Sequence, residues 1–180
     1  MLRRLLSFLL LPALLSCSKS DSNPIVDFGP GEGITYRTGQ NLPYGPSDPT
    51  DWTSDAEWSK QERNLFPELS FDLNGPQQPA LVSSGTAYPN PAAGYATWSL
   101  QSFRSAGSGL NTYSMRAVLV NRKYQTMLRL GPTDFVMGIN FTMNYLGAGL
   151  SPNELYRLYY VVYNAGGLVY KGHGDVRYAQ

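Results

Sequence analysis

Residues 155–163 read Leu-Tyr-Arg-Leu-Tyr-Tyr-Val-Val-Tyr. Apolar or aromatic side chains stand at both odd and even positions of this run, so an extended strand would present them on both of its faces. A strand of this kind is typical of the centre of a sheet that is covered on both sides. The run therefore predicts a central strand in a layered β-protein.

Short segments on either side of this run also have the pattern of strands separated by turns. Ala96, Trp98 and Leu100 alternate with polar residues within 95–103, which predicts a half-buried strand. The number and spacing of such segments predict a mainly β fold, an immunoglobulin-like antiparallel β-sandwich. The other expected strands are 113–120, 124–130, 134–143, 168–171 and 175–178, with turns at 105–109, 121–123 and 172–175.

One short helix is expected in the first half of the chain. Ser54 and Glu57 have the spacing of a capping box, and Pro67 stops the helical pattern. The helix is therefore expected over residues 54–65, with a strand at 68–73 after it. Two tryptophans flank its first turn, and helical spacing favours for them a role in fastening this helix to the sheet over a role in ligand binding. These are Trp52 and Trp58.

The chain begins with a charged and then an apolar stretch. Arg3 and Arg4 precede an apolar run over residues 5–15. This run is well short of the roughly 20 residues that a membrane-spanning helix needs. It is therefore expected to be a removable signal rather than a transmembrane anchor.

The apolar run leads into Leu14-Leu15-Ser16-Cys17, which contains the only cysteine of the 180-residue chain. This pattern resembles the lipobox of bacterial lipoproteins, whose peptidase cuts before a cysteine that carries lipid. The resemblance implies a signal peptide over 1–16, cleavage between Ser16 and Cys17, and lipid attachment at Cys17. Attachment through more than one acyl chain gives durable membrane binding.

Small polar residues follow the cysteine, and we expect a lipidated flexible tether over 17–28. Lys19 and Asp21 partly resemble the signal that takes Bacteroidota lipoproteins to the cell surface. The protein is therefore expected at the outer membrane, on either its periplasmic face or the cell surface. A single domain should fill 29–180 and be stabilised by packing alone, because no second cysteine exists for a disulfide.

Tyr88-Pro89-Asn90-Pro91 is followed by Ala-Ala-Gly. This motif resembles the opening of the C-terminal sorting domains of type-nine secretion in Bacteroidota, which are small immunoglobulin-like sandwiches. The resemblance implies a sandwich core over 88–180, with an irregular region and the helix over 29–87. The chain ends in Arg-Tyr-Ala-Gln instead of the terminal lysine of those domains, so only the fold is carried over.

The tyrosine-rich run together with Gly172-His173-Gly174-Asp175 is similar to small Bacteroidota lipoproteins that have no established activity. His173 is the only histidine. No nucleophile motif accompanies it, since Ser108 lies in Ala-Gly-Ser-Gly-Leu and not in a Gly-x-Ser-x-Gly elbow. A structural turn at 172–175 is therefore expected, and no catalytic residue is assigned.

Asp48-Pro49-Thr50-Asp51 is the one oxygen-rich stretch that suggests calcium, with Asp55 and Glu57 close by. It lacks the alternate spacing and the glycine of a calcium loop. One histidine and a lipidated cysteine also argue against zinc. A turn is favoured here, and we expect neither a metal nor a cofactor.

These features favour a non-catalytic envelope module that binds another envelope protein, and they rank an enzyme last. Without Arg3 and Arg4 the 14 basic residues no longer outnumber the 13 acidic ones, which argues against a nucleic-acid partner. The alternative is a glycan-binding lipoprotein that stacks polysaccharide rings on exposed tyrosines. Burial of these tyrosines between sheets would favour the module. The candidate tyrosines are Tyr156, Tyr160, Tyr163 and Tyr170.

Overall fold

The computed structural model describes residues 24–29, 33–78, 82–102 and 112–179 of the chain. Most of its regular structure is β, which confirms the mainly β prediction, and the only helix within the described residues is short. The elements are α1 (Lys60–Arg63), β1 (Val82–Tyr88), β2 (Tyr95–Ser102), β3 (Tyr113–Val120), β4 (Thr126–Phe135), β5 (Gly138–Asn144), β6 (Leu155–Asn164) and β7 (Gly167–Arg177).

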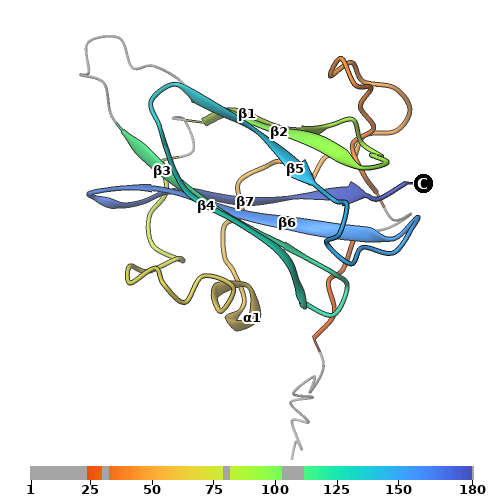
Figure 1. Cartoon of the computed structure of the whole chain (residues 1–180). Coiled ribbons are helices and arrows are strands. Elements are labelled where there is room, and N and C mark those ends of the chain that lie inside the picture. The colour runs from red at the N-terminus through yellow and green to blue at the C-terminus, as the bar shows by residue number, and fades with distance from the viewer. Residues whose placement is uncertain (1–23, 30–32, 79–81, 103–111, 180) are drawn as a thin grey trace, which may run out of the picture.

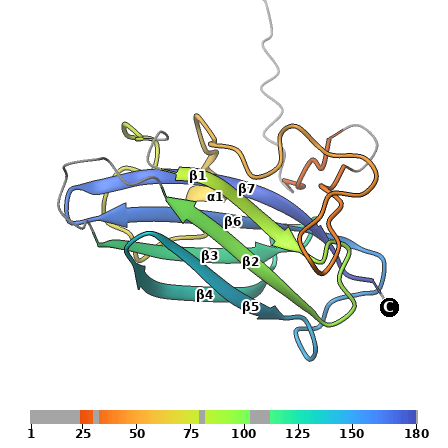
Figure 2. The same cartoon turned by 90° about the horizontal axis from the view of Figure 1, so that it is seen from above.

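The strands form two antiparallel sheets that pack as a sandwich. One has the order β1-β2-β5 and the other has the order β4-β3-β6-β7. Figure 1 shows three layers, because the segment that carries α1 lies on the far side of the four-stranded sheet. Figure 2, seen from above, shows the three-stranded sheet crossing in front of the other one.

Strand β6 explains why the run at 155–163 is apolar on both faces. It pairs with β3 on one side and with β7 on the other. Leu158 and Tyr160 point into the core between the sheets, which we call the inter-sheet core. Tyr159 and Val161 point the opposite way, into a second core, which we call the outer core. The prediction of a central strand is therefore confirmed.

The outer core is covered by the N-terminal half of the chain. The region 29–87, expected to be irregular, thus contributes a packed layer and not only connections. Trp58 stacks on Phe66 with ring centroids 5.5 Å apart and meets Tyr159 edge-on at 5.6 Å. The buried members of the outer core from this half are Val26, Phe28, Ile34, Trp58, Leu65, Phe66 and Leu73.

The helix is shorter than expected, and its cap lies elsewhere. Ser59 caps α1 and forms the capping box with Glu62, so the box expected from Ser54 and Glu57 is wrong. Ser54 instead forms a β-bridge with Gly172. The strand expected at 68–73 is also wrong, because this part of the chain forms turns and irregular structure.

Trp52 does not pack on the helix as expected. It belongs to the inter-sheet core, where its ring stacks on Tyr160 with the centroids 6.4 Å apart. Trp58 does fasten the helical segment to the sheet. The expectation for the two tryptophans is therefore confirmed for one and wrong for the other, and neither has a surface position that suits a ligand.

The turn expected at 172–175 is wrong, because β7 runs without a break from Gly167 to Arg177. Its two glycines are required by close packing and not by a turn. A Cβ on Gly172 would collide with the backbone oxygen of Thr53, and a Cβ on Gly174 would collide with the ring of Trp52. The glycines therefore let the segment around Trp52 lie directly on the strand.

The Tyr-Pro-Asn-Pro motif connects β1 to β2 and does not open the first strand, because β1 ends at Tyr88. The core expected over 88–180 thus leaves out β1. The strand expected at 134–143 is divided between the end of β4 and β5. The turn at 121–123 is confirmed by hydrogen bonds to the side chain of Asn121. The turn expected at 105–109 lies outside the described residues.

Candidate functional site

A short segment of the chain lies along the outer edge of β7. The backbone N–H of Trp52 donates to the oxygen of His173 at 2.8 Å, and that of Asp55 donates to the oxygen of Lys171 at 3.0 Å. These bonds cover an edge that would otherwise be free for pairing. Four ionisable side chains considered in the sequence analysis gather at this edge, which we call the β7 seam: Asp51, Asp55, His173 and Asp175.

Arg157 and Asp175 form the strongest ion pair of the β7 seam. Arg157 Nε donates to Asp175 Oδ1 and its Nη2 donates to Oδ2, each at 2.7 Å. The Asp175 side chain is 1% exposed. Arg157 also donates to the backbone oxygen of Asp27 at 2.9 Å and lies over the ring of Phe28. This one guanidinium therefore fastens the beginning of the domain to β6 and β7.

Asp51 joins two backbones that are far apart in the sequence. Its Oδ2 accepts from the N–H of Thr35 at 2.9 Å, and its Oδ1 accepts from the N–H of Asp175 at 2.8 Å. Burial, and then the negative charge of Asp175, raise the pKa of Asp51 to about 7. The carboxyl group thus takes up a proton in the folded protein at a pH where it is ionised in the unfolded chain.

The stability of the protein should therefore fall as the pH rises from about 4 to about 8. In this window the folded state binds more protons at Asp51 than the unfolded state does, so the free energy of unfolding decreases by about 2–4 kcal/mol. Urea unfolding at several pH values measures this slope. Asp51→Asn, which has no carboxyl proton to lose, should show a smaller slope, and the remainder comes from Asp175, whose pKa is also raised by burial. An equal slope in both proteins would contradict the assignment.

Lys171 and His173 are held in the same seam. Lys171 is buried, and its Nζ donates to the oxygen of Ala56 at 2.8 Å and to Asn74 Oδ1 at 3.0 Å. Burial lowers the pKa of Lys171. His173 Nδ1 lies 2.8 Å from Asp55 Oδ1. Within the described residues, no hydrogen bond links His173 to a serine or threonine hydroxyl that would act as a nucleophile.

Asn90, in the middle of the Tyr-Pro-Asn-Pro motif, is a residue that sequence reasoning did not single out. Its side chain is buried and donates to the backbone oxygens of Thr35 and Asp175, at 3.2 and 2.9 Å. Its Oδ1 accepts from the N–H of Arg177 at 3.0 Å. The amide thus fastens the N-terminal segment to β7, and the β7 seam as a whole binds one part of the chain to another.

The tyrosines expected to contact a glycan do not form an exposed surface. Tyr156, Tyr160 and Tyr170 are buried in the inter-sheet core. Tyr160 and Tyr170 stack there at 5.9 Å, and Tyr156 accepts from the backbone N–H of Ser151 at 2.7 Å. Tyr163 is partly buried against the outer core. Stacking on a sugar needs a free ring face, so the three buried tyrosines cannot form the platform that the glycan alternative requires.

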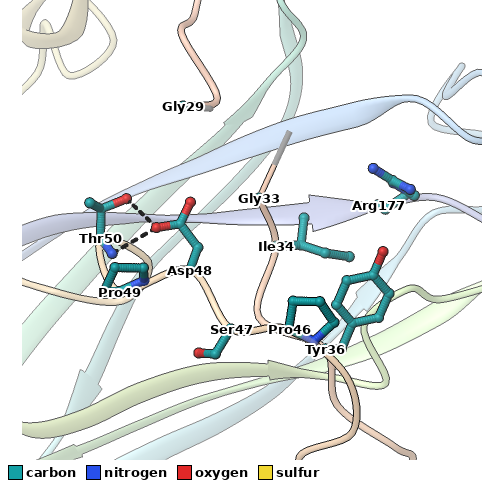
Figure 3. A pocket seen from close by; sticks show the side chains of 10 residues that line it. All are labelled: Gly29, Gly33, Ile34, Tyr36, Pro46, Ser47, Asp48, Pro49, Thr50 and Arg177. Carbon is teal, nitrogen blue, oxygen red and sulfur yellow. Dashed lines mark hydrogen bonds between the residues drawn. The ribbon is translucent and has the colours of Figure 1, made fainter. Parts of the chain in front are cut away.

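An open groove lies where the loop 46–50 faces the end of β7 (Figure 3). It has a volume of about 540 Å³. Figure 3 shows Asp48 and Thr50 on one side, Arg177 and Tyr36 on the other, and Ile34 between them. Asp48 accepts from the N–H and the hydroxyl of Thr50 at 2.8 and 2.7 Å, which confirms the turn favoured for this stretch.

Arg177 differs from Arg157 in having no acidic partner among the described residues, and its Nε is buried without a hydrogen bond. No sequence pattern points to this groove, because its two sides come from opposite ends of the domain. No group of three His, Cys, Asp or Glu side chains within the described residues is arranged to hold a metal ion. Ser16 and Cys17 lie outside the described residues.

No model of a known protein family matches the chain. A search of the curated proteins likewise finds no significant similarity. Within the described residues, no helix is both long enough and apolar enough to cross a membrane. The functional argument therefore rests on the sequence pattern at Cys17 and on the geometry of the β7 seam and the groove.

Proposed function

We propose that the protein is a non-catalytic module of the cell envelope, anchored at the outer membrane by lipid on Cys17, that acts by binding another envelope protein. The β7 seam carries this proposal. Its acid, base and ammonium groups, which an enzyme would keep for substrate, donate to and accept from other parts of the same chain. Side chains that are bonded within the chain in this way stabilise the fold, so we expect a partner to bind at the exposed surface.

The open edge of β4 supports a docking role. Strand β4 is the last strand of its sheet and pairs only with β3 in the described part of the chain. Most of its side chains are exposed or half-buried. The β7 edge at the opposite end of the sheet is covered by the segment around Trp52. An uncovered edge strand offers backbone donors and acceptors to a strand of a partner.

Co-purification from solubilised outer membrane tests this proposal. The tagged wild type should bring down a protein in stoichiometric amount. Met127→Pro and Leu128→Pro form a matched pair, because neighbouring N–H groups of a strand point to opposite sides. Both substitutions remove a half-buried side chain that packs against the inter-sheet core. One proline also removes a bond to β3 and should lower the unfolding temperature further, whereas the other removes an outward donor and keeps the bonds to β3.

The more stable of the two proline variants, which keeps the bonds to β3, should lose the partner protein. Retention of the partner by this variant would contradict docking at the β4 edge. Absence of any stoichiometric protein from the wild-type preparation would contradict the module itself. A second candidate function, binding of a surface glycan, is favoured by the groove beside Arg177 and not by the buried tyrosines.

A further inference from the structure

We propose that the groove between Asp48 and Arg177 binds a hexuronate, a sugar whose ring carries a carboxylate. This inference rests on the second candidate function, and it depends neither on the β4 edge nor on the lipid. Three features of the groove carry it: an arginine without an acidic partner, a carboxylate oxygen fixed on the opposite side, and an apolar surface between the two.

Arg177 supplies the group that would recognise the carboxylate. Its backbone is fixed at the end of β7, because its N–H donates to Asn90 Oδ1 at 3.0 Å and its oxygen accepts from Ala92 at 3.0 Å. Its Nε is buried with no hydrogen-bond partner in the described part of the chain. This enclosed atom is out of reach of a ligand in the groove, but the guanidinium lines the groove, and its terminal Nη groups would offer a ligand carboxylate two charge-assisted donors.

Asp48 supplies an acceptor on the other side of the groove. Its Oδ1 is used by the two donors of Thr50, which fix the orientation of the carboxylate. Its Oδ2 lies directly over Gly33, where a Cβ would collide with it. Because Gly33 has no side chain, there is room for the Asp48 carboxylate at the groove. A fixed carboxylate oxygen is a good acceptor for a sugar hydroxyl.

Ile34, Tyr36 and Pro46 make the apolar part of the lining, with Ile34 between the two charged groups and Tyr36 beside Arg177. Tyr36 is held edge-on by Tyr44 with the ring centroids 5.6 Å apart. An apolar lining with a few fixed polar groups is typical of a small-molecule site, and 540 Å³ is within the usual size of such sites. The C–H face of a pyranose ring suits this surface.

The separation of the charges decides which acid fits. Asp48 and Arg177 lie on opposite sides of the apolar surface (Figure 3), so a ligand that meets both must carry its carboxylate at one end and hydroxyl donors at the other. A hexuronate has this arrangement across its ring. An α-amino acid carries its ammonium and carboxylate groups on one carbon and would meet only one side of the groove.

Calorimetric titration of the detergent-solubilised full-length protein tests the inference, with digalacturonate as the probe and the neutral disaccharide lactose as the comparison. Digalacturonate should bind saturably and at least tenfold more tightly than lactose. Arg177→Gln should abolish this preference, and Arg177→Lys should keep part of it, because lysine keeps the charge and loses the fork. Gly33→Ala should weaken binding by displacing Asp48.

The matched controls are Arg116→Gln, whose arginine pairs with Glu68 away from the groove, and Tyr95→Ala, whose ring is exposed elsewhere. Both should bind digalacturonate as the wild type does. The absence of saturable binding, an equal loss in Arg116→Gln, or tighter binding of the dipeptide Ala-Ala than of digalacturonate would overturn the inference. The stable β4 proline variant should still bind digalacturonate, so a failure of docking and a failure of sugar binding are distinguishable.

Discussion

Replacement of Arg157 by methionine should lower the free energy of unfolding by about 3–5 kcal/mol, because it leaves a buried carboxylate without its partner. The Asp175 side chain is 1% exposed and receives both of its side-chain bonds from this guanidinium. The same substitution removes the donor to the backbone oxygen of Asp27 and the cation over Phe28. Urea unfolding at neutral pH measures the loss.

Arg116→Met is the control for this prediction, since Arg116 forms a partly exposed ion pair with Glu68 whose side chains are 25% and 33% exposed. It should cost no more than about 1 kcal/mol. Asp175→Asn in the Arg157→Met background should restore part of the loss, because the unpaired charge is then gone. Equal losses in the free energy of unfolding for Arg157→Met and Arg116→Met would contradict the prediction that the buried ion pair contributes more than the partly exposed one.

Trp52→Ala should lower the free energy of unfolding by about 3–5 kcal/mol, the usual cost of truncating a buried tryptophan. The ring stacks on Tyr160 in the inter-sheet core and lies against Gly174 of β7. Its loss should also release the segment that covers the β7 edge. Hydrogen exchange should therefore show faster exchange at the N–H of Asp55, which donates to Lys171.

Gly174→Ala gives this prediction a second test. A Cβ at this position would displace the Trp52 ring, so the substitution should cost about 1–3 kcal/mol in the wild type. In the Trp52→Ala background the ring is absent and the cost should be much smaller. Tyr95→Ala, on an exposed side chain, should change stability by less than about 0.5 kcal/mol. If the losses in free energy of unfolding from Trp52→Ala and Gly174→Ala simply add in the double variant, the contact between the Trp52 ring and Gly174 would be contradicted.

The strands that sequence reasoning predicted correctly are those whose signal is local. Alternation within 95–103 and apolar character on both faces of 155–163 depend on the residues of one strand, so β2 and β6 follow from the sequence. The pattern of 155–163 requires two covering layers but does not say what forms the second one. That layer comes from the N-terminal half of the chain.

The errors arise where a distant contact decides between local alternatives. Two serine–glutamate pairs, at 54 and 57 and at 59 and 62, have capping-box spacing, and the first is prevented from capping because Ser54 pairs with Gly172. The glycines at 172 and 174 have the composition of a turn. They lie within a strand because Thr53 and Trp52 need the space.

The candidate site could not be predicted from the sequence for the same reason. Asp51 and Asp175 meet although 124 residues separate them, and the groove places Asp48 opposite Arg177. No local pattern relates such positions. Three of the four tyrosines that stood out by composition are core residues. Arg177 is an ordinary residue in the sequence, yet it lines the groove and has no acidic partner among the residues that the structure describes. The immunoglobulin-like assignment and the lipid anchor stay predictions.

The proposed function depends on lipid attachment at Cys17, and fractionation of cells that express the wild type or Cys17→Ser measures whether that residue anchors the protein. The wild type should sediment with the outer membrane. Cys17→Ser should leave the outer-membrane fraction and keep the unfolding temperature of the wild type. The described contacts that hold the domain begin at Val26, which lies within the stretch expected as a tether but nine residues beyond Cys17. Recovery of Cys17→Ser in the outer-membrane fraction, in the same proportion as the wild type, would contradict the account.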